Sequence, residues 1–91
     1  MEIINNKRAF QFEITFPDGE KATLQYRWLK ARMVLMHTIV PQSHRGKGIG
    51  DKLARHVLEY ARAHGLKLLV YCPFVQAFMN KHPEYNDLTE Q

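Results

Sequence analysis

The chain has 91 residues, of which 45% are hydrophobic, and a formal net charge of +4 at pH 7. This length allows one hydrophobic core but not two, so we expect a single domain over residues 1–91. No membrane span is expected, because the longest apolar run, residues 68–72, is far shorter than the roughly 20 residues that a span needs. The one cysteine excludes an intramolecular disulfide and favours a cytoplasmic protein.

The positive charge does not favour a nucleic-acid partner. Lysine and arginine are spread along the sequence, and their one local concentration is Arg45, Lys47 and Lys52. A nucleic-acid surface would need these residues clustered on one face. The distribution therefore favours a small anionic ligand near residues 45–52 over a nucleic acid.

The first half of the chain predicts three strands. Residues 8–16 alternate apolar and polar side chains, which is the period of a strand with one solvated face. A turn at Pro17-Asp18-Gly19 joins them to residues 20–29, so the two runs predict a β-hairpin. Residues 32–40 are apolar on both faces, which predicts a central strand. Pro41 ends this strand.

The second half predicts one βαβ unit followed by a helix. Residues 51–64 carry apolar side chains at helical spacing, and Gly65 is a natural left-handed residue after a helix. Residues 66–72 predict a buried strand, so strand, crossover helix and strand form a right-handed unit with parallel strands. Pro73 starts a short helix that ends near Lys81. The fold class is therefore α/β with a mixed sheet of the α+β type, antiparallel in its first half.

The loop Arg45-Gly46-Lys47-Gly48-Ile49-Gly50 lies between the predicted third strand and the amphipathic helix. Glycines there let the backbone approach a ligand closely, and the free N–H groups lie at the positive end of the helix dipole. With two cations beside them, these donors favour a phosphate or pyrophosphate. The spacing matches neither the triphosphate loop Gly-x-x-x-x-Gly-Lys-Ser/Thr nor the dinucleotide motif Gly-x-Gly-x-x-Gly. The alternative is a flexible glycine turn without a ligand.

The loop resembles the Arg/Gln-x-x-Gly-x-Gly/Ala acetyl-CoA motif of the GNAT acetyltransferase superfamily, with Arg45, Gly48 and Gly50 in its fixed positions. The segments Cys72-Pro73-Phe74 and His82-Pro83-Glu84-Tyr85 are similar to those of a subgroup of very short GNAT proteins. This resemblance implies a minimal GNAT fold in which the two parallel strands splay apart and hold the thioester between them. It also implies that the backbone binds the donor at two places. The CoA pyrophosphate would be bound by the backbone of the loop, which is Arg45, Gly46, Lys47, Gly48, Ile49 and Gly50. The pantetheine arm would pair with the strand end at Ile39 and Val40.

The chain departs from the superfamily pattern in two ways. It has only a hairpin before the motif, where full-length members have helices that shape the acceptor site. Acceptor recognition is therefore minimal, or a partner or a second copy in a homodimer supplies it. The tyrosine that usually protonates the leaving CoA thiolate is also missing, since no tyrosine lies between Phe74 and Lys81.

Two residues are the candidates for catalysis. Cys72 ends the last predicted strand just before a helix, where it is a nucleophile, a general acid that replaces the tyrosine, or a small buried side chain. His37 is the preferred base for the attacking amine, or else a strand histidine hydrogen-bonded on the solvated face. His44 is expected to contact phosphate or solvent. No metal is expected, because no histidine pair has the His-Glu-x-x-His spacing.

The function that this reading predicts is acetyl transfer from acetyl-CoA to an amine. The acceptor would be a small molecule, a peptide or a protein lysine. The alternative is a non-catalytic module that binds CoA or acyl-CoA.

Overall fold

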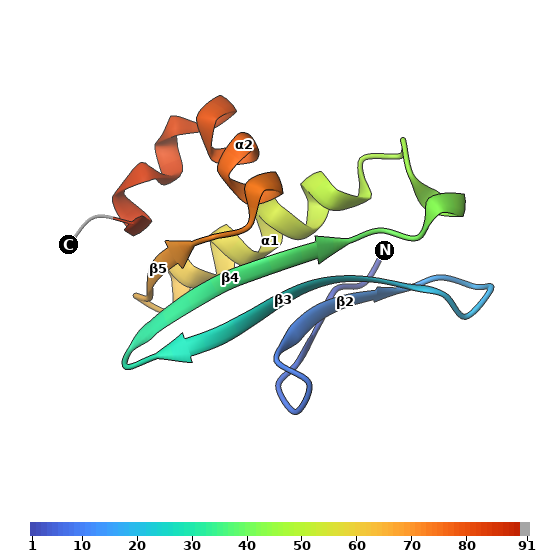
Figure 1. The fold of residues 1–91 in the computed structure, drawn as a ribbon, viewed down its shortest axis with the longest axis horizontal. Coiled ribbons are helices and arrows are strands. Elements are labelled where there is room, and N and C mark those ends of the chain that lie inside the picture. The colour runs from blue at the N-terminus through green and yellow to red at the C-terminus, as the bar shows by residue number, and fades with distance from the viewer. Residues whose placement is uncertain (90–91) are drawn as a thin grey trace.

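A computed structural model describes residues 1–89 of the chain (Figure 1). The two α-helices are α1 and α2, the two 3-10 helices are η1 and η2, and in chain order the elements are β1 (Ile4–Asn6), β2 (Gln11–Thr15), β3 (Lys21–Leu29), β4 (Arg32–Ile39), η1 (Gln42–His44), α1 (Ile49–Ala63), β5 (Lys67–Val70), α2 (Pro73–Lys81) and η2 (Pro83–Thr89). Neither α-helix is long and apolar enough to cross a membrane.

The five strands form one sheet in the order β1-β2-β3-β4-β5. Neighbouring strands are antiparallel from β1 to β4, whereas β4 and β5 are parallel and joined through α1. The predicted mixed sheet, the hairpin, the central position of β4 and the βαβ unit are therefore confirmed. β1 was not predicted, because three residues are too few for alternation to be recognised. η2 was also missed, since a 3-10 helix has little periodic signal.

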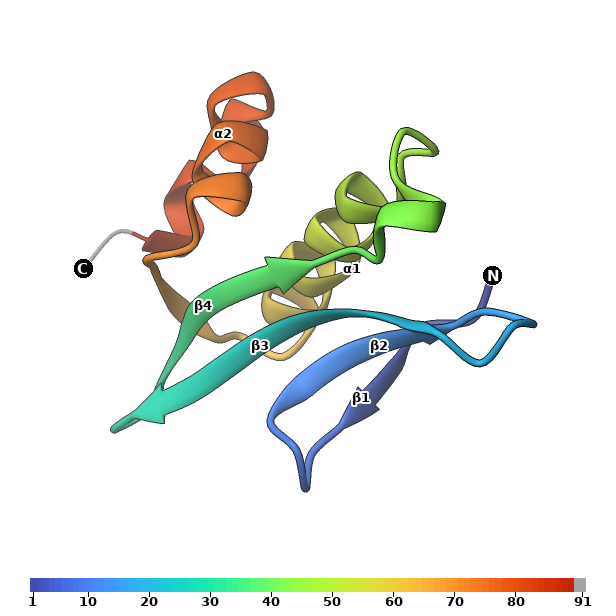
Figure 2. The same ribbon diagram turned by 45° about the vertical axis from the view of Figure 1, so that its right-hand side comes forward.

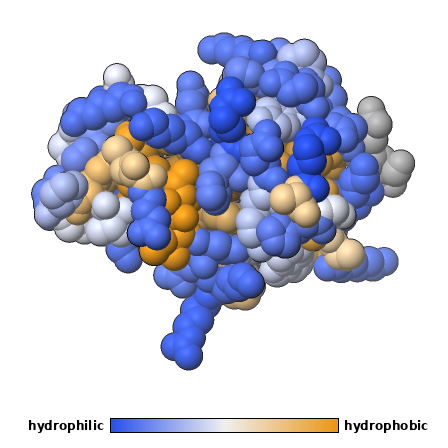
Figure 3. All heavy atoms as spheres, turned by 180° about the vertical axis from the view of Figure 1, so that it is seen from behind, coloured by the Kyte–Doolittle hydropathy of each residue, from blue (hydrophilic) through white to orange (hydrophobic). Residues whose placement is uncertain are grey.

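Both α-helices lie on one side of the sheet (Figures 1 and 2). The alternation of β2 and β3 directs apolar side chains toward them, such as Phe12, Leu24 and Tyr26, which are almost completely buried. These residues form one continuous core with α1, α2 and η2. Seen from the helix side, the surface is mostly hydrophilic, with hydrophobic atoms in separate small areas (Figure 3).

No helix covers the opposite face of the sheet within residues 1–89, and we call it the uncovered face. It carries the residues of β3 and β4 that pair as Thr23 with Ile39, Gln25 with His37 and Arg27 with Val34. Cross-strand partners share a face, so these side chains lie together on the side away from the core.

β4 has an irregularity near its middle. Gln25 pairs with His37 while Tyr26 pairs with Leu35, so Met36 is an extra residue without a partner on β3. On its other side, β4 pairs with β5 only as far as Leu35 and Val70. The last residues of β4, from Met36 to Ile39, therefore have a free edge where β5 turns away into α2. A bulge leaves its extra residue unpaired and redirects the strand, and bulges are common next to active sites.

Two glycines bound α1 with left-handed backbones. Gly48, at φ 75°, is the N-cap, and Gly65, at φ 64°, follows the helix. The predicted left-handed conformation of Gly65 is confirmed. The helix begins two residues before the predicted start, because Ile49 already packs into the core.

Candidate functional site

A groove of about 510 Å³ lies where the free end of β4 meets the glycine loop. The N-terminus of α1 and one side chain of α2 complete its wall. Its lining residues are Thr38, Ile39, Val40, His44, Arg45, Gly46, Gly48, Ile49, Gly50, Asp51 and Phe74.

The groove brings together the predicted donor-binding residues except Lys47, which lies exposed in the same loop and outside the lining set. Gly46 and Gly48 have φ of 81° and 75°, so the backbone here takes the left-handed region that other residues rarely adopt. The first N–H groups of a helix have no partner within that helix, and α1 starts at this point. The Arg45 Nε donates to the Val40 carbonyl at 3.0 Å, which ties the loop back to the end of β4. The arrangement can receive an anion.

Gly50 is required for packing rather than for an unusual backbone angle. A Cβ at this position would lie 2.6 Å from a ring atom of Phe74. Phe74 in turn lines the groove at the start of α2. The third glycine of the motif thus lets an aromatic ring from α2 rest against the first turn of α1. Sequence reasoning missed Phe74 as a groove residue, because nothing in the local pattern indicates this distant contact.

His44 is held by the β2–β3 hairpin. Its Nε2 lies 2.8 Å from an Asp18 carboxylate oxygen, and its ring stacks on Phe16 with centroids 3.7 Å apart and planes 5° from parallel. Beside it, the Ser43 hydroxyl donates to Glu20 at 2.9 Å. His44 also lines the groove, so its contact with phosphate stays a prediction, and its bonds to the hairpin are contacts that the sequence did not indicate. We call these four contact residues of the hairpin and the loop, Asp18, Glu20, Ser43 and His44, the hairpin brace.

The carboxylate of Asp18 is stabilised in its charged form. The backbone N–H of Glu20 and the hydrogen bond with His44 lower the pKa of Asp18 below its ordinary value. The ligand atoms of Asp18, Glu20 and His44 also lie within 4.8 Å of one another. All three already have hydrogen-bond partners, and this cluster alone assigns no metal.

The two predicted catalytic residues lie on different sides of β4. Cys72 is buried at 1% exposure, and its Sγ lies 3.2 Å from the Oγ1 of Thr38. Thr38 lines the groove, whereas Cys72 is outside the lining set. His37 is exposed on the uncovered face opposite Gln25 and does not line the groove. Thus one candidate reaches the groove through Thr38 and the other faces the opposite side of the strand.

Comparisons with known proteins show the family and the fold. A family model described as GCN5-related N-acetyl-transferase matches residues 11–88. The protein named NATD1 from Danio rerio is 32% identical over 89 residues, which cover 93% of this chain and 81% of that protein. NATD1 from Gallus gallus is 34% identical over 85 residues, covering 91% of this chain and 77% of that protein.

A solved structure has the same fold. A GCN5-like protein from Staphylococcus aureus, determined in solution by NMR, superposes with a TM-score of 0.73 at 29% identity. The match covers 96% of this chain and 85% of the bacterial one. Because the family model spans most of the chain and the fold agrees with a GCN5-like relative, the chain belongs to the GCN5-related N-acetyltransferase (GNAT) family of acetyltransferases.

Proposed function

We propose that this protein moves an acetyl group from acetyl-CoA to an amine, with the groove as the donor site. The observation that carries the proposal is that the glycine loop and the free edge of β4 meet in one groove. Pantetheine has amide groups spaced like those of a peptide, so an open strand edge can bind it as an added strand. The continuous core from β2 to η2 supports a single domain for this activity.

The residues of β4 would position the reaction. The backbone of Met36 is unpaired on the β3 side, and the pairing with β5 has already ended, so its polar groups are available to the thioester carbonyl. A backbone N–H there would stabilise the oxyanion as the amine nitrogen attacks the carbonyl carbon. The new C–N bond forms as the C–S bond breaks, and orientation over the thioester accounts for much of the rate.

Proton transfers complete the reaction. His37 on the uncovered face would take the proton that the attacking ammonium group must lose. Cys72 would supply the proton that the departing CoA thiolate needs through the Thr38 hydroxyl to which it is hydrogen-bonded, and the second proton that the nitrogen loses on becoming an amide would restore the Cys72 thiol. Cys72 is buried behind Thr38, through whose hydroxyl a proton can pass, whereas a nucleophile must reach the carbonyl carbon itself, so the geometry favours the general-acid role.

The test separates donor binding from turnover. CoA should raise the melting temperature, whereas pantetheine, which lacks the pyrophosphate, should raise it much less. Acetyl-CoA consumption should then depend on an added primary amine. Equal gains from CoA and pantetheine would exclude the loop as the pyrophosphate site.

The uncovered face favours a second candidate function. Without helices over the acceptor side, the domain could serve as a non-catalytic CoA-binding module within a larger assembly. That function predicts tight CoA binding with no turnover across polyamines, lysine peptides and peptides with free N-termini.

The hairpin brace should support donor affinity. We expect Asp18→Ala to raise the Kd for CoA about two- to fivefold, because His44 then loses its carboxylate partner and the adjacent loop is less fixed. Isothermal titration calorimetry measures the change, with Glu84→Ala as a matched loss of an exposed carboxylate away from the groove.

The same contact predicts a pH dependence. The pKa of Asp18 is lowered in the folded protein. The contribution of its carboxylate to the stability of the folded brace is therefore complete above the ordinary aspartate pKa, and it is lost as the pH falls through the lowered value. Equal affinities of wild type and Asp18→Ala at neutral pH would show that the brace does not position the loop.

A further inference from the structure

The uncovered face carries two arginines that make no salt bridge within residues 1–89. Arg27 of β3 pairs with Val34, and Arg32 of β4 pairs with Leu29. Arg32 is two residues from Val34 on the same strand, so the two arginines are diagonal neighbours on one face. The Arg27 guanidinium donates to the Tyr26 carbonyl at 2.7 Å and lies 5.6 Å from the Phe10 ring centre.

Arg32 has an unusual side chain. Its Nη1 is buried and has no hydrogen-bond partner among residues 1–89. Buried polar atoms in folded proteins almost always have a partner, so this nitrogen is a donor that can still accept a ligand group as its partner. Guanidinium groups match the planar geometry of a carboxylate and bind it with two parallel hydrogen bonds.

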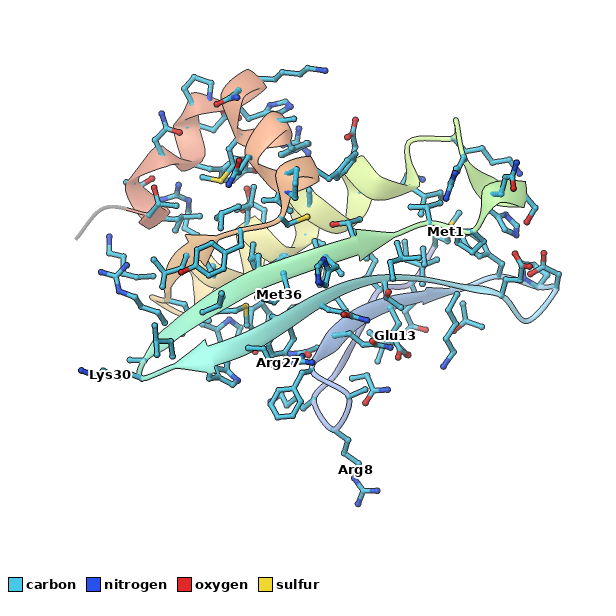
Figure 4. All side chains as sticks on the ribbon, in the orientation of Figure 1. Met1, Arg8, Glu13, Arg27, Lys30 and Met36 are labelled. Carbon is cyan, nitrogen blue, oxygen red and sulfur yellow. The ribbon has the colours of Figure 1, made fainter. Side chains whose placement is uncertain are left out.

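The arginines lie close to the proposed reaction centre. Arg27 is opposite Val34, which is two residues before the bulge at Met36. Two residues of extended strand span roughly 6.6 Å. Figure 4 shows Arg27 and Met36 on adjacent strands. A molecule with its amine at the bulge would therefore place a group several bonds away beside Arg27.

The remaining charges of this face do not suit a cationic acceptor. Of its strand residues, Glu13 is the one carboxylate among residues 1–89. Glu13 is buried and accepts hydrogen bonds from Asn6, Gln11 and Lys21. Lys67, which pairs with Arg32, donates to the Asp87 carbonyl. His37 is the titratable group beside the bulge. Within the described strands of this face, no carboxylate is left to bind a second ammonium group.

We propose that the acceptor amine carries a carboxylate, which Arg27 and Arg32 bind on the uncovered face. The inference rests on the proposed acetyl transfer and narrows its substrate class. It favours amino acids or acidic peptides and excludes polyamines as good acceptors.

Three amines with the same six-carbon chain test the proposal: 6-aminohexanoate, hexylamine and 1,6-diaminohexane. They offer the same primary amine with an anionic, a neutral or a cationic far end. We expect kcat/KM for 6-aminohexanoate to exceed that for hexylamine by about tenfold, with diaminohexane lowest. The kcat/KM for a lysine within an acidic peptide is then compared with that for free 6-aminohexanoate. A higher value for the peptide indicates a peptide acceptor, and a higher value for 6-aminohexanoate indicates a small-molecule acceptor.

Arg27→Gln should remove most of the preference for the anionic amine. Arg8→Gln is the matched control, since it removes one cation from the β1–β2 turn, where Arg8 projects away from the sheet (Figure 4). Equal kcat/KM values for the three amines, or an unchanged preference in Arg27→Gln, would overturn the proposal. So would a change in oligomeric state in Arg27→Gln, measured by light scattering, because a second copy would then occupy this face.

A binding measurement keeps the acceptor site separate from catalysis. With CoA bound, 6-aminohexanoate should shift the NMR signals of the Arg27 and Arg32 Nε–H groups, and hexylamine should not. If these shifts occur without turnover of any amine, the carboxylate site stands and the acetyl-transfer proposal fails. If turnover occurs without the shifts, the acetyl-transfer proposal stands and the carboxylate site fails.

Discussion

Gly48→Val is expected to abolish the rise in melting temperature that CoA produces, while the protein remains folded. Gly48 has φ 75° and lines the groove. A Cβ at this position meets nothing within 4 Å, so the new side chain enters open space rather than the core. That space is where the proposed pyrophosphate would approach the loop. The valine also favours a different backbone angle, which would turn the N–H groups of the loop away.

Gly65→Val is the matched control for Gly48→Val. Gly65 has φ 64°, and an added Cβ there also meets nothing within 4 Å, but it lies at the other end of α1. Both variants should lose about 1–2 kcal/mol of stability from the strained backbone. Only Gly48→Val should lose the gain with CoA. A normal gain in Gly48→Val would place the pyrophosphate elsewhere.

The parts of the fold that sequence reasoning predicted are those with local, repeated signals. The apolar spacing in residues 51–64 predicts α1, and the alternation in residues 8–16 predicts β2, because each pattern reports one periodic backbone. Pro73 and Gly65 predict the start of α2 and the end of α1 through their own backbone preferences. The order of these elements then leaves few possible topologies.

The parts that it missed depend on contacts between distant segments. Asp18 meets His44 across 26 residues, and Thr38 meets Cys72 across 34. The bulge at Met36 arises from the register between β3 and β4, which no residue type in the strand indicates. Sequence reasoning could therefore identify the glycine loop as a candidate anion site, but not the side chains that support it.

The contact between Thr38 and Cys72 predicts a large loss of kcat when the thiol is removed. We expect Cys72→Ala to lower kcat by about 100-fold and to leave the KM for acetyl-CoA nearly unchanged, because general-acid catalysis contributes on this scale. Cys72 lies outside the groove lining, so its removal takes away no direct contact that the donor makes along the groove. Thr38→Val should show a loss of kcat of similar size, since it removes the hydroxyl through which the Cys72 thiol reaches the groove.

A loss of packing must be separated from the loss of a proton donor. Val75→Ala provides the comparison, because Val75 is fully buried on α2 and outside the groove lining. It should lose at least as much stability as Cys72→Ala and retain its kcat. Cys72→Ser, which restores a hydroxyl donor of similar size, should recover part of the activity.

Incubation with acetyl-CoA and no acceptor should leave the protein mass unchanged, because the Sγ is buried against Thr38. A mass increase at Cys72 would make it the nucleophile, and an unchanged kcat in Cys72→Ala would make it a packing residue.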